Sequence, residues 1–324
     1  SAVKEIEDIR AQLTAEGNTG SEMGMTRILR VYIYSRLTDL HGDVPYSEAG
    51  QGYINGILKP KYDAQKDIYM DFLKELEEAV AQIGASTTLG VSDLVFQGDT
   101  AKWKAWGNSM MLRLAMRLSK VDAATAQAWA EKAAPNTMTS NDHIAMIAHT
   151  DGPEGINKNG HGEVFDADDN PRMSKTFVDW LKDDPRLPIL AARRSDGSTA
   201  IADLIGMPNG STGVTVPDTS IYAEPNRNVI TGRAVPMVLQ TYAEVRLLKA
   251  EMAQRGWSVT GSAQAHYDAG VKAAMQMLSG IYPNAAAITD DEVTAYLAAK
   301  PYDASKGLQM IGEQYWAATL LNEY

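Results

Sequence analysis

Residues 97–119, QGDTAKWKAWGNSMMLRLAMRLS, constrain the fold of this chain more than any other stretch. Asp99 follows Gly98, and its carboxylate can accept hydrogen bonds from the free amides of a first helical turn, so we expect a helix to begin there. Apolar side chains then recur at steps of three and four residues, which is a helical period: Trp103, Trp106, Met110, Leu114 and Leu118. The stretch therefore predicts a buried central helix over residues 99–119, with both tryptophans packed in the core.

Two arginines on this helix, Arg113 and Arg117, lie four residues apart, one turn above the other. Like charges at this spacing repel each other mildly. We therefore expect each guanidinium either to reach solvent or to meet a carboxylate from a neighbouring helix.

Helical periodicity continues on both sides of the central stretch. The further segments with a helical pattern are residues 2–15, 22–40, 63–83, 123–134, 235–255, 263–278, 290–299 and 304–324. The segment 235–255 contains a proline, Pro236, only near its start, where proline is tolerated in a helix. Leaving aside residues 2–15, these segments and the central helix form four consecutive helical hairpins.

The hairpins predict an all-α protein. Helical hairpins that bury their faces only against their neighbours are typical of solenoid repeats. Residues 241–275 fit a tetratricopeptide-like unit best, but the spacing between units is irregular. The residues by themselves thus favour helical hairpins more firmly than a tetratricopeptide superhelix. We interpret residues 22–140 and 236–324 as the helical scaffold of a single domain that spans residues 1–324.

Residues 141–235 differ from the scaffold because they are rich in glycine and proline, and only residues 174–182 have a clear helical pattern. Long irregular regions inside helical proteins tend to carry function. We expect a loop-rich insertion that the scaffold holds in place and that contains the ligand-binding region.

The composition excludes several classes of function. Lys and Arg number 30 against 41 Asp and Glu, a formal net charge of −11. Without a basic block, such a chain is a poor nucleic-acid binder, since phosphate neutralisation needs clustered Lys and Arg. The absence of cysteine excludes thiol catalysis, disulfides and Cys-ligated metals. No apolar run approaches the ~18 residues that a membrane span needs.

No catalytic or cofactor motif is recognisable in the sequence. The five histidines lack the spacing of a zinc pair, and phosphate loops, dinucleotide fingerprints and hydrolase elbows are missing. Residues 166–170, DADDN, resemble a calcium loop, but Pro171 and Phe177 stand where an EF-hand needs Gly and Glu. A solvated acidic turn and a structural calcium both stay open there. Since nothing selects a glycosidase carboxylate pair, we expect neither an enzyme nor a cofactor.

Four segments, in order, resemble motifs of the SusD/RagB-like family of nutrient-binding outer-membrane lipoproteins of Bacteroidetes. The resemblance covers nearly the whole chain and is weakest from about residue 143 to about residue 180. The motifs are DLHGDVPY at 39–46, then GD, KW, NS and RLAMRL within 98–118, DPRL at 184–187, and TYAEVRLLKAE at 241–251 followed by RGW at 255–257.

The resemblance implies a tetratricopeptide-like scaffold of four units and a non-catalytic protein that captures glycans or oligopeptides at the cell surface. It also implies a SusC-like TonB-dependent transporter as partner and a lipid on an N-terminal cysteine as the only membrane attachment. Because the chain has no cysteine and opens at Ser1 without an apolar signal core, we expect both ends to be trimmed. Two other classes stay open: a helical glycoside hydrolase, and a tetratricopeptide-like adaptor that binds protein segments.

Candidate ligand-binding residues are aromatic and polar side chains in loops. Neutral oligosaccharides are bound by aromatic faces against sugar C–H surfaces, with amides, carboxylates and guanidinium groups on the hydroxyls. Residues 222–227 offer all four kinds of group, in Tyr222, Glu224, Asn226 and Arg227. A competing site lies around His41 and Tyr53, and Asn157 and His161 offer a third set. The alternative is that each tyrosine only covers a helix end.

Overall fold

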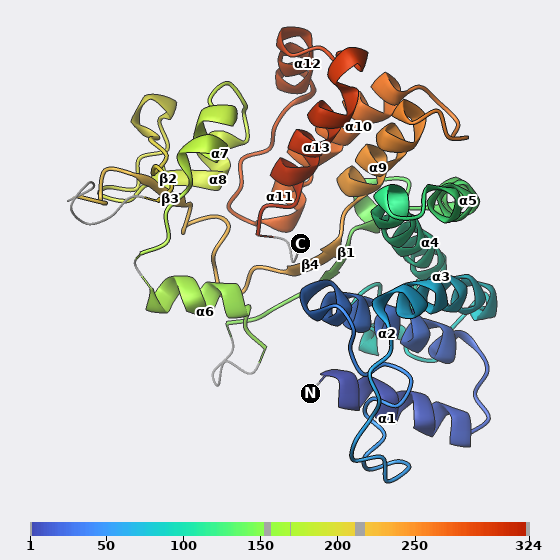
Figure 1. Ribbon diagram of the computed structural model, residues 1–324. Coiled ribbons are helices and arrows are strands. Elements are labelled where there is room, and N and C mark those ends of the chain that lie inside the picture. The colour runs from blue at the N-terminus through green and yellow to red at the C-terminus, as the bar shows by residue number, and fades with distance from the viewer. Residues whose placement is uncertain (1, 152–156, 169, 211–217, 322–324) are drawn as a thin grey trace. The chain divides into compact units, whose positions relative to one another are not determined.

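The computed structural model describes residues 2–151, 157–168, 170–210 and 218–321. These residues are predominantly helical, with only short strands, as expected of an all-α chain (Figure 1). The chain forms two compact units. Unit 1 comprises Ser1–Ala145 and Gln240–Ala263, and unit 2 comprises Met146–Leu239 and Gln264–Tyr324.

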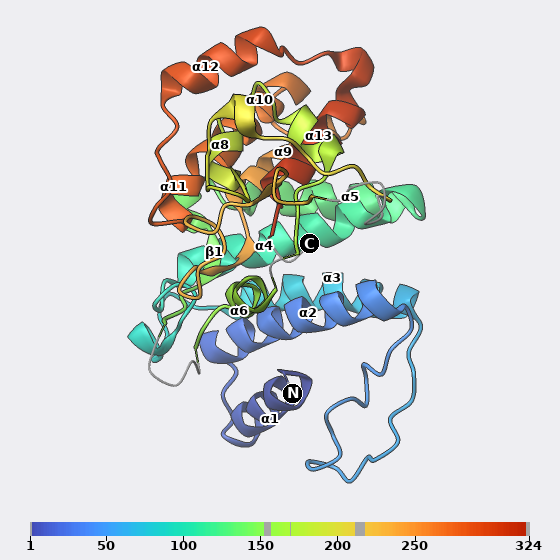
Figure 2. The ribbon, with the colours of Figure 1, turned by 90° about the vertical axis from the view of Figure 1, so that its left-hand side faces the viewer.

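Unit 1 is a stack of helices in which successive helices pack side by side, and α9 packs on α4 (Figure 2). Its helices are α1 (Ala2–Ala15), α2 (Ser21–His41), α3 (Gln65–Gln82), α4 (Thr100–Arg117), α5 (Ala123–Ala133) and α9 (Tyr242–Gln254). Short 3-10 turns connect them: η1 (Gly90–Ser92), η2 (Leu118–Lys120), η3 (Ala134–Asn136) and η4 (Asn141–His143). The pairs α2–α3 and α4–α5 are the first two hairpins that the periodicity predicts.

Helix α4 is the buried centre of unit 1, which confirms the prediction for the central stretch. Asp99 caps the helix by accepting hydrogen bonds from the backbone N–H groups of Ala101 and Lys102, at 3.0 and 3.1 Å. Trp103 and Trp106 are 2% and 0% exposed. Gly107 lets α4 approach its neighbours closely, because a Cβ at that position would lie 2.5 Å from a methyl carbon of Val80.

Both arginines of α4 meet carboxylates from other helices. The Arg113 guanidinium forms a bidentate pair with Glu244 of α9, with nitrogen–oxygen distances of 2.5 and 2.6 Å. Both side chains of this pair are buried. Arg117 reaches Asp39 of α2 at 3.1 Å. Of the two alternatives, pairing with a neighbouring helix is therefore confirmed.

Unit 2 combines short helices with paired strands. Its helices are α6 (Gly160–Ala167), α7 (Lys175–Trp180), α8 (Leu187–Leu190), α10 (Ala263–Gln276, all but its first residue), α11 (Leu278–Ile281), α12 (Asp290–Ala299) and α13 (Gly307–Ala318), with the turns η5 (Ile201–Asp203) and η6 (Ala304–Lys306). Strand β2 (Ala191–Arg193) pairs antiparallel with β3 (Ala223–Pro225). Strand β1 (Ala145–Ile147, all but its first residue) pairs with β4 (Met237–Gln240, all but its last residue).

The core of unit 2 contains a buried polar network around Arg186. Its guanidinium forms a bidentate pair with Asp184, at 2.9 and 2.6 Å, and also donates to Gln314 of α13 at 2.8 Å. Gln314 in turn donates to the hydroxyl of Tyr296 at 2.9 Å. Through these bonds the segment around α8 is fixed against the C-terminal helices of the same unit.

Two expectations about secondary structure are wrong. Residues 235–255 do not form one helix: Met237–Gln240 is strand β4, and Thr241 caps α9 by accepting from the backbone N–H of Glu244 at 3.1 Å. Pro236 therefore lies outside the helix. Helix α6, in the region expected to be loop, was also missed; Asn159 caps it and its Gly162 lies against the backbone of Arg233.

Replacing Trp106 by alanine should lower the free energy of unfolding by about 3–5 kcal/mol, because it leaves a cavity at the centre of unit 1. Urea denaturation followed by circular dichroism measures the change. Val91→Ala is the control, since Val91 is 83% exposed and its truncation should have little effect. An unchanged stability of Trp106→Ala would contradict the central position of this side chain.

The stability of unit 1 should depend on pH through Glu22. Its carboxylate accepts from the backbone N–H of Thr88 at 2.7 Å and from the hydroxyls of Thr87 and Thr88, and these bonds lower its pKa from 4.5 to about 2. A carboxyl whose folded pKa is depressed contributes stability above its unfolded pKa and loses it as the pH falls toward the folded pKa.

Glu22→Gln should therefore be less stable than the parent protein by about 1–2 kcal/mol near neutral pH. The difference should shrink as the pH falls from about 4.5 to about 2. Denaturation curves of both proteins across this range test the effect, and a difference independent of pH would contradict it.

Candidate functional site

The loop between α2 and α3, residues 42–64 (the α2–α3 loop), presents large side chains to solvent. Tyr53 is 89%, Leu58 84% and Tyr62 72% exposed. Figure 2 shows the loop leaving the layer of helices and returning to the start of α3. Exposed apolar groups that gather on one element mark interaction surfaces, since folding normally buries such groups.

The Asp63 carboxylate joins the two ends of the α2–α3 loop. Asp63 accepts hydrogen bonds from the backbone N–H groups of Tyr46 and Ser47, at 3.2 and 2.8 Å, and Val44 pairs with Asp63 in a β-bridge. Burial raises the pKa of the Asp63 carboxyl, but the hydrogen bonds from Ser47 and Tyr46 outweigh this effect and leave the pKa below its usual value. The loop therefore begins and ends at a defined position while its middle projects into solvent.

Beneath the loop lies a buried ionic network that joins α1, α2 and α3. Arg30 of α2 pairs with Glu7 of α1 at 2.7 Å and donates to the hydroxyl of Tyr46 at 2.6 Å. The Tyr46 hydroxyl donates to Asp71 of α3, and Tyr34 donates to Glu7 at 3.0 Å. Burial raises the pKa of Tyr46 well above its usual value, so its hydroxyl stays protonated. The start of the loop is thus tied to three helices.

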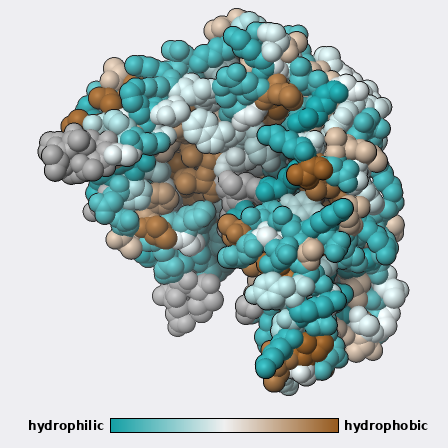
Figure 3. Space-filling model, viewed as in Figure 1, coloured by the Kyte–Doolittle hydropathy of each residue, from teal (hydrophilic) through white to brown (hydrophobic). Residues whose placement is uncertain are grey.

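Two open hollows lie between the α2–α3 loop and α1. One has a volume of about 540 Å³ and is lined by Lys4, Asp8, Tyr53 and Ile54. The other, of about 420 Å³, is lined in part by Arg10 and Thr14 of α1 and by Gln51 and Asn55 of the loop. Figure 3 shows hydrophobic side chains at the surface of the lower end of the view, where Figure 1 draws α1 and this loop.

The amide side chains beside Tyr53 are held in place. Asn55 donates to the side-chain oxygen of Gln51 at 3.0 Å, and Gln51 donates to the backbone oxygen of Ser47 at 3.0 Å. The surface formed by α1 and the α2–α3 loop therefore offers an exposed aromatic ring, two ordered amides, a carboxylate and two cations. Polar groups placed beside an apolar surface can fix the orientation of a bound ligand.

The sequence-predicted residues of unit 1 do not come together. Tyr53 lines the larger hollow, whereas His41 is the last residue of α2, is exposed, and lines neither hollow. Sequence reasoning missed Lys4 and Asp8 as neighbours of Tyr53, because they come from α1, and it missed Gln51 of the second hollow, because it lies in a loop without periodicity.

The segment 222–227 lies in unit 2, on and after strand β3. Glu224 and Asn226 are buried, at 5% and 3% exposed. The Glu224 carboxylate pairs with Arg227 at 3.0 Å and with Arg194 at 3.5 Å. Tyr222 and Arg227 are half-buried. Their role in ligand binding stays a prediction, and the contacts described for Glu224 are internal to unit 2.

Asn157 and His161 lie near one another in unit 2. The backbone oxygen of Asn157 meets Nδ1 of His149 at 3.2 Å. His149 and His161 line a cavity of about 240 Å³ together with apolar residues that include Val164, Ile230 and Tyr282. Asn157 is exposed, and its side chain is not among those that line this cavity.

All five histidines and most of the carboxylates lie in the part of the chain that the structure describes. No group of three or more His, Asp or Glu residues among them could hold a metal ion. Of the acidic segment 166–170, Asp169 lies outside the described residues. No described helix is long and apolar enough to cross a membrane.

Comparison with known proteins decides the family. A family model described as starch-binding and associating with the outer membrane matches residues 1–324. The chain belongs to the SusD-like family. No curated protein matches the sequence.

Three solved structures are similar to this SusD-like chain. One, a chitin-binding protein, is 33% identical with a TM-score of 0.86, over 98% of this chain and 70% of that one. A Bacteroidetes SusD-like protein, AC2a, is 26% identical with a TM-score of 0.83, over 98% and 73%. A chitin-binding SusD homologue from Flavobacterium johnsoniae is 22% identical with a TM-score of 0.77, over 98% and 70%.

Family membership confirms several expectations. The fold is the all-α, tetratricopeptide-like fold of the SusD-like proteins. SusD-like proteins are binding proteins, so the expectation of a non-catalytic role is confirmed. The family binds glycans and is associated with the outer membrane.

Replacing Asp63 by alanine should release the base of the α2–α3 loop, because it removes the acceptor of the Tyr46 and Ser47 amides. We expect amide hydrogen exchange at Ser47 to become at least about tenfold faster, since an unprotected amide exchanges through local opening. Exchange followed by mass spectrometry measures this. Asp67→Ala, at an exposed position of α3, is the control, and equal protection in both variants would contradict the role of Asp63.

Proposed function

We propose that this SusD-like protein binds chitin-type oligosaccharides on the surface formed by α1 and the α2–α3 loop. The observation that carries the proposal is the exposure of Tyr53, 89%, on a loop whose ends are fixed. The choice of chitin rests on the similarity to a chitin-binding protein at 33% identity over 98% of this chain.

An exposed tyrosine ring suits a sugar because its apolar face packs against the C–H face of a pyranose. Gln51 and Asn55 of the loop, and Lys4 and Asp8 of α1, can then bond to sugar hydroxyls and N-acetyl groups. These side chains line the two hollows that flank Tyr53 and Ile54. Lys4 is paired with Asp8 at 2.8 Å and Arg10 with Glu7 at 2.7 Å, so the charges of this surface are largely balanced. An aromatic ring with amides and balanced charges favours a neutral glycan over a nucleic acid.

The fixed base of the loop supports this use. A ligand that orders a flexible loop loses affinity through the entropy of ordering, and a preorganised loop avoids much of that loss. Asp63 and the network of Glu7, Arg30 and Tyr46 hold the ends of the loop before any ligand arrives. The exposed middle of the loop then presents Tyr53 at a defined place.

The proposal also covers where the bound glycan goes and where the protein is located in the cell. We propose that the bound glycan passes to a SusC-like TonB-dependent transporter, and that a lipid on an N-terminal cysteine outside this sequence holds the protein at the outer surface. The support is the outer-membrane association of the family. Pull-down of a SusC-like transporter with the full-length lipoprotein tests the partner, and its absence from the pull-down would contradict this part.

Tyr53→Ala should weaken the binding of chitohexaose at least tenfold, which is about 1.4 kcal/mol, whereas Tyr53→Phe, which keeps the ring, should bind nearly as the parent does. Isothermal titration calorimetry measures both, with maltohexaose as the starch-type comparison. Unfolding should barely change, because the side chain is exposed.

Two further variants place the site. Tyr222→Ala and Arg227→Ala, in the segment that the sequence favours, should leave affinity unchanged if the loop surface binds the glycan. A tenfold loss in these variants with normal binding by Tyr53→Ala would move the site to unit 2 and refute the loop. Binding of maltohexaose in preference to chitohexaose would refute the choice of chitin and keep the site.

A further inference from the structure

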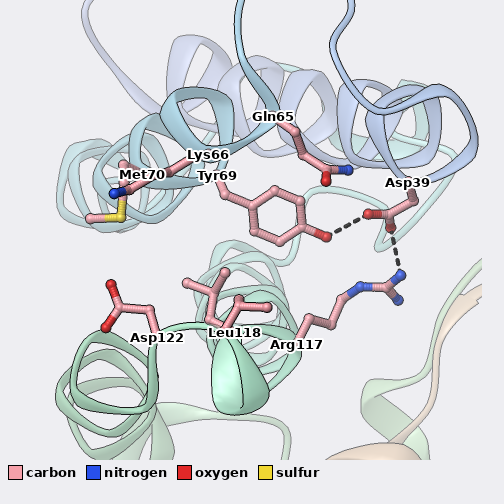
Figure 4. Close-up of a pocket in the computed structure, with 9 residues that line it drawn as sticks. Asp39, Gln65, Lys66, Tyr69, Met70, Arg117, Leu118 and Asp122 are labelled. Atoms are coloured by element: carbon pink, nitrogen blue, oxygen red, sulfur yellow. Dashed lines mark hydrogen bonds and ion pairs between the residues drawn. The ribbon is translucent and has the colours of Figure 1, made fainter.

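A separate pocket in unit 1, of about 440 Å³, lies between the N-terminal part of α3 and the start of α5 (the α3–α5 pocket; Figure 4). Tyr69 and Met70 of α3 line one side, and Leu118 and Val121 line the other. None of these residues takes part in the glycan surface proposed above. The volume falls in the range of small-ligand sites, about 300–1,000 Å³.

One end of this pocket is closed by a hydrogen bond and an ion pair among its lining side chains. The Tyr69 hydroxyl donates to one oxygen of Asp39 at 2.5 Å, and Arg117 pairs with the other at 3.1 Å. Figure 4 shows these three side chains meeting at the right of the view. The Asp39 carboxylate is balanced there by Arg117, so this end needs no charged group from a ligand.

The other end carries two charges of opposite sign on facing elements. In Figure 4, Lys66 of α3 and Asp122 at the start of α5 stand on opposite sides of the pocket, away from Asp39. Asp122 is held by the backbone N–H and hydroxyl of Thr125, at 3.1 and 2.8 Å, which also lower its pKa and keep it ionised. Lys66 is exposed and forms no ion pair with any residue that the structure describes, but its positive charge contributes to the lowered pKa of Asp122.

The walls between the two ends are apolar and partly uncovered. Met70 is 38% and Val121 80% exposed, although both line the pocket. An apolar group placed between them would remove this surface from water, which is favourable. A sugar is not the fitting occupant, because the Tyr69 ring is only 5% exposed and offers no face for stacking.

From this arrangement we propose that the α3–α5 pocket binds a free α-amino acid with a large apolar side chain. The α-carboxylate lies against the Lys66 ammonium, and the α-ammonium lies against the Asp122 carboxylate. The side chain fills the space lined by Met70, Leu118 and Val121, toward Tyr69. The ligand needs a free α-carboxylate and a free α-ammonium to pair with Lys66 and Asp122. It also needs a large side chain to fill the apolar part of the pocket.

The test is calorimetric titration of the folded protein with L-phenylalanine. We expect a dissociation constant of about 1 mM or tighter, the range for a ligand of this size. Glycine, which lacks the side chain, and N-acetyl-L-phenylalanine amide, which lacks both charges, should bind at least tenfold more weakly. If L-phenylalanine does not bind even at about 10 mM, ten times the expected dissociation constant, the proposal is wrong.

Variants assign the two charges. Lys66→Met keeps the length of the side chain, and Asp122→Asn keeps an acceptor for Thr125, so both should fold normally. Each should weaken the binding of L-phenylalanine at least tenfold. Lys74→Met, at an exposed position two turns further along α3, should bind as the parent protein does.

The glycan site serves as an independent reference. Lys66→Met and Asp122→Asn should bind chitohexaose as the parent protein does, and Tyr53→Ala should bind L-phenylalanine normally. Equal affinity of the parent and both charge variants for L-phenylalanine would refute the α3–α5 pocket as its site. Loss of chitohexaose binding in Tyr53→Ala bears only on the glycan proposal, so the two failures are distinguishable.

Discussion

The bidentate pair between Arg113 and Glu244 holds unit 1 together across a long gap in the sequence. Both side chains are buried, and 131 positions separate them along the chain. Breaking a buried pair by removing one partner leaves an uncompensated charge, which is strongly destabilising. The pair therefore fixes α9, which follows the whole of residues 146–239, onto the helix that forms the centre of the N-terminal stack.

The motifs that identify the family act mainly on the fold. Arg113 and Glu244 each belong to one of them, Asp184 and Arg186 form the buried pair of a third, and Asp39 pairs with Arg117. Such residues can be recognised in the sequence because the fold requires these ion pairs at fixed positions. The groups that we propose for glycan binding, Tyr53 and its neighbours on α1, lie outside these motifs. The motifs therefore identify the family, whereas the residues proposed to bind the glycan belong to no motif, and the ligand is not predictable from the sequence.

The helices of unit 1 were predictable because each has a long apolar stripe, and Asp99 is a strong start signal. The start of α9 was not, since β4 and α9 are contiguous and only the cap formed by Thr241 separates them. Helix α6 has eight residues, two of them glycine, and no propensity that would reveal it. Tertiary contacts decide such short elements. In the same way, the sequence places Glu224 in a loop, where a carboxylate is expected to be exposed. In the structure Glu224 is buried and forms an ion pair with Arg227.

The position of Glu7 has a mechanical consequence. Glu7 lies in the middle of α1 and bonds to Arg30 and Tyr34 of α2. Tension applied from the N-terminal side of the chain therefore passes from α1 into α2 through buried bonds. It does not pass through the exposed middle of the α2–α3 loop, whose ends are joined to each other by Asp63. Lys4 and Asp8, which line the hollow beside Tyr53, lie on this same helix, so a pull on α1 acts on one wall of that hollow while the loop keeps its fixed ends.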